Sequence, residues 1–181
     1  MAARSSWAAG YSASATPASV EAHNPGPVPV EQRRRRSIAM TGEELDAFLR
    51  AGMVCRVGTV GTGGQPHVSP LWFVWDGEAL WLYSIVRSQR WVDLERQPRV
   101  SVVVDAGEEY GELRGVELLG EVEQVGENPR RGEPCSALVL PERLFADKYY
   151  GGSLAYDGLH AWLRLQPRKL VSWDFRKLPK G

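Results

Sequence analysis

Apolar positions along the chain change their spacing near residue 52. Leu45, Phe48 and Leu49 recur at intervals of three and four residues, which predicts a short amphipathic helix. Thr41 and Glu44 match a capping box at its start, and Gly52 is expected to end it in the C′ position. After Gly52 the apolar residues mostly alternate with polar ones, a pattern typical of β-strands.

The alternating part of the chain divides into short strands with turn residues between them. Ser88 is expected to begin a helix that ends near Gln97 before Pro98, and one or two helices are expected in 128–150, with Pro141 as a first helical residue. Asp76 and Gly77 indicate a two-residue hairpin turn. The expected strands are 53–60, 67–75, 79–84, 99–105, 112–126, 159–165 and 169–175.

Six or seven strands joined mostly by hairpins, with short helices between them, predict an α+β fold built on a small antiparallel barrel. In the long strand 112–126, Gly115 and Gly120 indicate a bulge or a close backbone approach. In strand 67–75 both faces are apolar, which indicates a barrel interior on one side and a partner subunit on the other.

The first 37 residues differ from the rest in composition. They are rich in Ala, Ser, Pro and Gly, without aliphatic periodicity, so we expect a disordered tail at 1–37 and one folded domain at 38–181. The run Arg33–Arg36 lacks interleaved aromatic residues and is interpreted as a solvated segment rather than a nucleic-acid or membrane patch. An alternative is that the protein begins at Met40.

Charge and cysteine content exclude several classes of protein. The chain has 22 basic and 22 acidic side chains, a balance that argues against a dedicated nucleic-acid-binding protein. No apolar run approaches the roughly 18 residues of a membrane-spanning helix. Cys55 and Cys135 are too few for a disulfide framework or a four-ligand zinc site, so we expect no metal and a reduced, cytoplasmic location.

A candidate anion site lies where strand 79–84 leads into the helix that follows Ser88. Hydroxyl, amide and guanidinium groups gather there beside the free N–H groups of a helix start, a combination that favours phosphate. The residues are Tyr83, Ser84, Arg87, Ser88, Gln89 and Arg90. Arg56 lies in an apolar strand and needs either a phosphate or a carboxylate such as Asp105 or Glu117; the pattern leaves both open.

No side chain is identified as a catalytic nucleophile or as a tuned acid–base pair. His67 is interpreted as structural, and His160 with Asp157 as part of a turn. A phosphate site without catalytic side chains points to a cofactor that supplies its own chemistry.

The order of several segments resembles the pyridoxamine 5′-phosphate oxidase-like superfamily, whose fold is the flavin-binding split barrel. The resemblance covers about residues 41–178 and depends on the spacing of its segments together. They are Arg56–Val60, Gly64–Phe73, Tyr83–Ser84, Ser88–Arg90, Asp93–Val100, Leu113–Gly120 and Ser172–Leu178.

The resemblance implies a homodimer with two cofactor sites at the subunit interface. It implies phosphate contacts from Arg56, Ser88, Gln89 and Arg90, and a position for Trp173 near the cofactor ring. It also implies contacts around the ring and the ribityl chain from Val57, Gly58, Thr59, Tyr83 and Ser84.

Two departures narrow the expected activity. The Arg-x-His substrate clamp of true pyridoxamine phosphate oxidases is missing after Trp173, and Gly115 stands where flavin enzymes tend to have Gln. The sequence is therefore more similar to the deazaflavin branch, which uses coenzyme F-420. This implies an oxidoreductase that transfers hydride to an electron-poor small organic acceptor, with walls for the ring from Trp72, Tyr83 and Trp173. The alternatives are an FMN-dependent oxidase or reductase and a non-catalytic dimer that binds flavin, haem or fatty acid.

Overall fold

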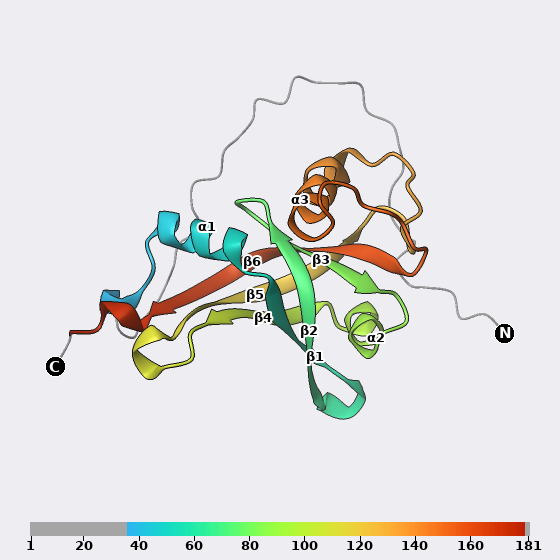
Figure 1. Cartoon of the computed structure of the whole chain (residues 1–181). Helices are drawn as coiled ribbons and strands as arrows, with labels where there is room; N and C mark the ends of the chain where they lie inside the picture. The colour runs from blue at the N-terminus through green and yellow to red at the C-terminus, as the bar shows by residue number, and fades with distance from the viewer. Residues whose placement is uncertain (1–35, 180–181) are drawn as a thin grey trace, which may run out of the picture.

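The computed structural model of the chain describes residues 36–179. Six antiparallel strands close into a barrel in the order β1-β2-β3-β6-β5-β4, with three short α-helices around it (Figure 1). The strands are β1 Val54–Val60, β2 Pro66–Trp75, β3 Leu80–Ile85, β4 Arg99–Ala106, β5 Arg114–Val125 and β6 His160–Asp174. The α-helices are α1 Gly42–Ala51, α2 Gln89–Arg96 and α3 Val139–Tyr149. Single turns of 3-10 helix occupy Arg36–Ile38, Thr62–Gly64, Tyr110–Glu112, Ser136–Leu138 and Phe175–Lys177. The predicted α+β barrel is confirmed.

The starts of α1 and α2 follow the predicted capping. Thr41 accepts the N–H of Glu44 while the Glu44 carboxylate accepts the N–H of Thr41, which completes the capping box. Ser88 caps α2. Gly52 ends α1, but with an extended backbone rather than a left-handed one. Glycine is needed there because a Cβ would lie 2.8 Å from a Val104 methyl carbon.

The tight hairpin turn expected at Asp76–Gly77 is present but lies one residue further along. Trp75 pairs with Leu80 and the Asp76 N–H donates to the Ala79 carbonyl at 3.2 Å, so Gly77 and Glu78 are the central residues. The Asp76 carboxylate accepts the backbone N–H groups of Glu78 and Ala79, which stabilises the turn.

The two separate strands expected at 159–165 and 169–175 are one continuous strand, β6. Pro167, between the two expected strands, pairs with Gly120 at a register shift where β6 has one extra residue, Arg168, between the partners of Leu119 and Gly120. The bulge accepts a residue that has no N–H to donate, so the strand passes through the proline. Helix α3 likewise begins two residues before Pro141, which lies within its first turn.

Two apolar cores lie on opposite sides of the sheet. One fills the barrel and includes Trp91 and Leu94 from α2. The other lies beneath α3, where Phe145 packs with Trp81, Tyr83 and Trp162. Both faces of β2 were expected to be covered. In the single chain Val68 and Trp72 on its outer face remain 65% and 43% exposed, so the chain alone does not cover that face fully.

The prediction of a disordered tail falls almost wholly on residues 1–35, outside the described residues. At its boundary Arg36–Ile38 form a 3-10 helix, and Ile38 is buried. Packed structure therefore begins before Met40.

Candidate functional site

Arg90 is a buried cation without a carboxylate partner. Its side chain, 6% exposed, enters the end of the barrel from the first turn of α2. Nε and Nη2 donate to the Ser84 hydroxyl at 3.3 and 3.2 Å, and Nη1 donates to the Ser69 hydroxyl. Burial lowers the pKa of Arg90. Among the described residues Arg90 forms no salt bridge, so the charge is balanced only by neutral oxygens.

A buried guanidinium without a counter-charge is costly, and an anion placed beside it would offset that cost. The first N–H groups of α2 add a partial positive charge at the same place. Arg87, exposed in the preceding turn, forms no salt bridge with any described residue. This end of the barrel is therefore suited to a phosphate.

The other side chains predicted for this end are used by the fold. The Ser88 hydroxyl accepts the Trp91 N–H at 3.2 Å and donates to the Ile85 carbonyl at 2.8 Å. Gln89 Nε2 and the Thr59 hydroxyl each donate to Asp93 at 2.8 Å. Thr59 and Ser88 therefore act mainly through the shape they give to the site.

Asp93 is an organising carboxylate that the sequence analysis missed. It is 1% exposed; burial raises its pKa, but hydrogen bonds from Gln89 and Thr59 outweigh burial and hold that pKa below its usual value. Its place on the inward face of α2, two residues from Trp91, was the available signal.

Of the two partners left open for Arg56, a phosphate or a carboxylate, the structure shows the carboxylate. Its guanidinium lies 2.7 Å from an Asp105 oxygen, and both side chains are about half exposed. Arg56 pairs with Pro70, whereas Ser69, which binds Arg90, pairs with Val57. Because neighbouring side chains on a strand point to opposite faces, Arg56 and Arg90 lie on different faces of the sheet.

Val57 and Gly58 contribute in different ways. The Val57 side chain is fully buried in the barrel, so only its backbone is available to a ligand. A Cβ on Gly58 would lie 3.3 Å from the Ser101 carbonyl, which leaves little room for a side chain there.

An aromatic pocket of about 400 Å³ lies on the outer face of the sheet, opposite the face from which Arg90 binds Ser69 and Ser84. Tyr83 and Pro70 line it, and because each is the chain neighbour of Ser84 or Ser69, its side chain points to the other face. The Tyr83 hydroxyl is buried and has no hydrogen-bond partner among residues 36–179, and burial raises its pKa well above the usual value. The pocket is lined by Val54, Pro70, Leu71, Trp72, Tyr83, Phe145, Tyr150 and His160.

Planar side chains are already aligned around this pocket. The ring of Trp72 stacks on Tyr149 with centroids 4.5 Å apart and planes 4° apart. His160 stacks on Tyr83 at 4.8 Å, and its Nδ1 lies 2.6 Å from Asp157, so the predicted turn also orients this imidazole. The size and lining suit a flat ring system.

Trp173 does not line the aromatic pocket. It lies over Gly115 on β5, where a Cβ would come within 2.3 Å of the indole ring. Trp173 shares this row of the sheet with Asp105, the partner of Arg56. The structure thus brings Ser84 and Arg90 together at the barrel end and places Tyr83, Arg56 and Trp173 on the outer face of the sheet.

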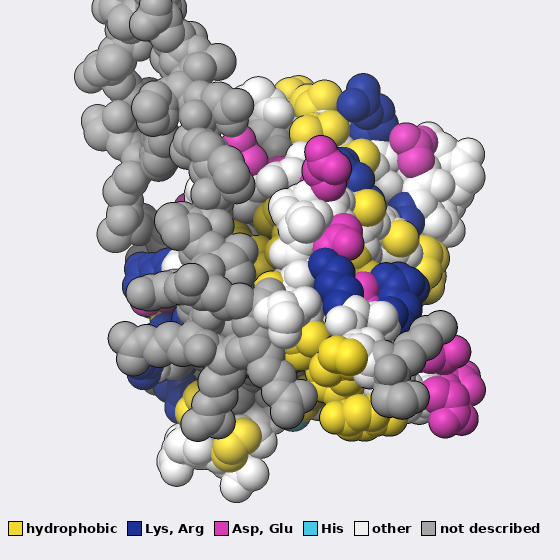
Figure 2. Space-filling model, turned by 90° about the vertical axis from the view of Figure 1, so that its left-hand side faces the viewer, with side chains coloured by type: hydrophobic (Ala, Val, Ile, Leu, Met, Phe, Trp, Pro, Cys, Tyr) yellow, Lys and Arg dark blue, Asp and Glu magenta, His cyan; other side chains and the backbone are white. Residues whose placement is uncertain are grey.

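Charges elsewhere are interspersed. On the face shown in Figure 2, basic side chains lie beside acidic ones among apolar surface, unlike the single-sign stripe of a nucleic-acid-binding surface. Within residues 36–179 no group of three or more metal-ligating side chains is present. No helix in that range is long and apolar enough to cross a membrane.

A family model described as pyridoxamine 5′-phosphate oxidase matches residues 41–174. The chain belongs to this family. The resemblance and the split-barrel fold expected from the sequence are both confirmed. None of the curated proteins searched gives a significant match.

Several solved structures are similar to this chain. A conserved hypothetical protein from Mycobacterium tuberculosis is 31% identical, with a TM-score of 0.69, covering 83% of this chain and 96% of its own. A FAD-binding protein from Mesorhizobium loti is 19% identical, with a TM-score of 0.58 and coverages of 74% and 93%. An F-420 reductase is 24% identical, with a TM-score of 0.53 and coverages of 69% and 94%. The last two show likeness of fold.

Proposed function

We propose that this split-barrel protein binds the deazaflavin coenzyme F-420 and catalyses hydride transfer to an electron-poor small organic acceptor. The observation that carries the proposal is the buried Arg90 without a described carboxylate partner, at the end of a barrel whose outer face carries an aromatic pocket. A cofactor with a phosphate and a flat ring matches both features.

Residues at the barrel end and in the aromatic pocket would share the contacts to such a cofactor. Arg90, with Ser69 and Ser84, would hold the phosphate, and the exposed Arg87 would add a second positive charge. Trp72 and Tyr83 would pack against the ring. When bound, the reduced cofactor supplies a hydride from its ring carbon. The protein supplies orientation and exclusion of water, and no side chain is assigned a covalent role.

The surroundings of Gly115 favour a deazaflavin over FMN. Related flavin enzymes, by the resemblance, tend to carry Gln at this position. Here the Trp173 ring occupies the space that any side chain on Gly115 would need. In place of a glutamine that would contact a flavin, this chain has the Trp173 indole packed on the backbone of Gly115.

The working unit of the proposal is a cytoplasmic homodimer. Val54, Val68, Trp72 and Ile85 are apolar and exposed in the single chain, and a second copy would cover them and wall the cofactor sites. Both cysteines are unpaired, as in a reducing compartment.

The test is a paired titration of the full chain with purified F-420 and with FMN, followed by cofactor fluorescence. We expect tighter binding of F-420, and oxidation of its reduced form by a quinone or an enone only when protein is present. Arg90→Gln should weaken binding, whereas Arg168→Gln, a matched change at a 72% exposed surface arginine, should not. Preference for FMN would replace the deazaflavin assignment, and tight binding without turnover would indicate a carrier.

A further inference from the structure

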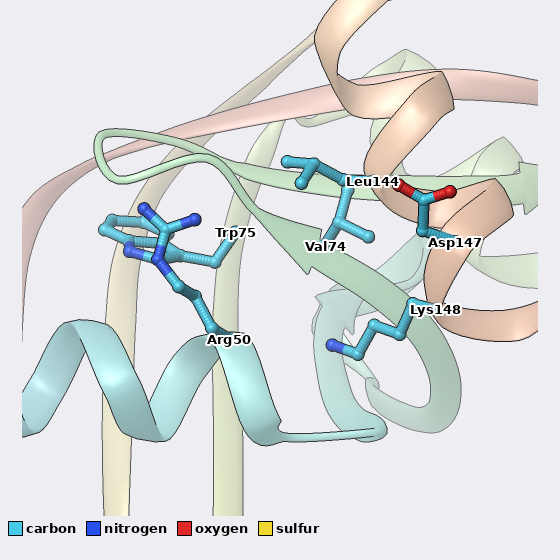
Figure 3. A pocket seen from close by; sticks show the side chains of 6 residues that line it. All are labelled: Arg50, Val74, Trp75, Leu144, Asp147 and Lys148. Carbon is cyan, nitrogen blue, oxygen red and sulfur yellow. The ribbon is translucent and has the colours of Figure 1, made fainter. Parts of the chain in front are cut away.

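A second pocket, separate from the cofactor site, lies between the end of α1, strand β2 and helix α3 (Figure 3). Its volume is about 300 Å³, and Val74, Trp75 and Leu144 supply an apolar wall. Two cations, Arg50 and Lys148, and one carboxylate, Asp147, complete the lining. Figure 3 shows Arg50 entering from α1 and Lys148 extending from α3.

Lys148 is half buried and lacks a counter-charge. Its Nζ donates to the Phe73 carbonyl at 3.2 Å and lies 4.4 Å from the centroid of the Phe73 ring. No salt bridge joins Lys148 to any described carboxylate, Asp147 included. A neutral carbonyl and a ring face therefore replace most of the water that an ammonium normally has around it.

The groups packed around Lys148 do little to stabilise its charge. Burial lowers the pKa of Lys148 to about 8. The Cys55 thiol of β1 is itself buried, with its pKa raised to about 12, so it is uncharged near neutral pH. Burial likewise raises the pKa of Tyr149 on α3 to about 12, so this phenol is also neutral.

Arg50 adds a second positive charge to the pocket. Its Nε binds Asp46 on the same helix at 2.7 Å, and nearly half of its side chain remains exposed to solvent. The free part of its guanidinium offers a partner for an anionic group on a ligand. Asp147, on the solvent side, is the remaining charged group of the lining.

We propose that Lys148 is a nucleophilic amine that forms an imine with carbonyl compounds bearing a flat apolar body and a carboxylate. A lysine desolvated in an apolar pocket is a recognised way to obtain a neutral amine near neutral pH. The flat body would lie against Val74, Trp75 and Leu144, and the carboxylate would approach Arg50.

The reaction needs no oxidant. The Lys148 ammonium first gives one proton to water, and the neutral nitrogen then attacks the carbonyl carbon. A carbon–nitrogen double bond forms, and the carbonyl oxygen leaves as water with the two remaining amine hydrogens. Near pH 7 an amine with a pKa of about 8 is roughly 10% neutral, against less than about 0.1% for an ordinary lysine.

The test labels the full chain with 4-carboxybenzaldehyde and, separately, benzaldehyde, each with cyanoborohydride to trap the imine. Peptide mass spectrometry then compares Lys148 with Lys169, an exposed lysine on β6, within the same folded molecules. We expect Lys148 to react with 4-carboxybenzaldehyde about tenfold faster than Lys169. We also expect its rate to rise between about pH 7 and 9, around its pKa of about 8.

The two aldehydes and one variant separate the parts of the proposal. Arg50→Gln should remove the preference of Lys148 for the carboxylated aldehyde over benzaldehyde. Equal labelling of Lys148 and Lys169 in the folded wild-type chain would overturn the nucleophile assignment. Equal rates with the two aldehydes at Lys148 would overturn the anionic ligand class. Both readouts are independent of any cofactor.

Discussion

Replacing Arg90 by Met should have opposite effects on the two states of the protein. In the ligand-free protein the change removes a buried charge that is balanced only by the hydroxyls of Ser69 and Ser84. The lost hydrogen bonds and the relieved desolvation are of similar size, so we expect the free energy of unfolding to change by no more than about 1 kcal/mol.

In the bound state the same change removes a charge-assisted contact to phosphate. Such contacts contribute about 1.5–3 kcal/mol, which corresponds to a loss of roughly 10- to 150-fold in F-420 affinity. Urea unfolding without ligand measures the first effect, and a fluorescence titration measures the second. Arg90→Lys keeps the charge but not the forked geometry, so we expect a smaller loss of affinity.

One result would refute this reasoning about Arg90. If Arg90→Met lowered the ligand-free stability by more than about 3 kcal/mol while leaving affinity unchanged, the guanidinium would be a structural element of the barrel end. Arg168→Gln controls for the general loss of a positive charge, since Arg168 makes only an exposed pair with Glu121.

Three further predictions concern other parts of the molecule. Gly115→Gln should displace the Trp173 ring and destabilise the fold by about 1–3 kcal/mol, measured by thermal unfolding; an unchanged midpoint would show that the indole moves freely. Asp174→Asn should lower the free energy of unfolding at neutral pH, because an Arg176 hydrogen bond stabilises the Asp174 carboxylate and lowers its pKa. The contribution of this carboxylate to stability is present above about pH 4 and is lost as pH falls through the lowered pKa, so the stabilities of the wild-type and variant proteins should converge in acid. A stability difference that stays constant with pH would contradict the assignment. Val68→Glu should leave single-chain stability within about 0.5 kcal/mol but prevent dimerisation, measured by light scattering; a dimer of unchanged affinity would place the interface elsewhere.

Local chemistry in the sequence was enough to predict the elements that depend on neighbouring residues. The capping box of Thr41 and Glu44 and the Ser88 cap were correct because their partners lie within three residues. The close approach at Gly115 was also expected, since a glycine inside a strand marks such a place. Alternating apolar positions determined the α+β barrel.

Contacts between distant strands decided what these patterns left open. Whether Arg56 meets a carboxylate or a phosphate depends on Asp105, which the barrel closure brings to 2.7 Å. The continuity of β6 through Pro167 depends on a bulge of β6 against Leu119 and Gly120 of β5. Both depend on register, which neither segment carries by itself.

For the candidate site, too, some features followed from the sequence and others only from the tertiary structure. The sequence placed Tyr83, Ser84 and Arg90 at a strand end and a helix start, where local geometry favours an anion. Only the tertiary structure showed that Arg90 is buried without a carboxylate and that Ser69 joins it. The sequence thus determined which groups are available, and the folded barrel determined which charges are compensated, because desolvation and pairing depend on contacts across the whole fold.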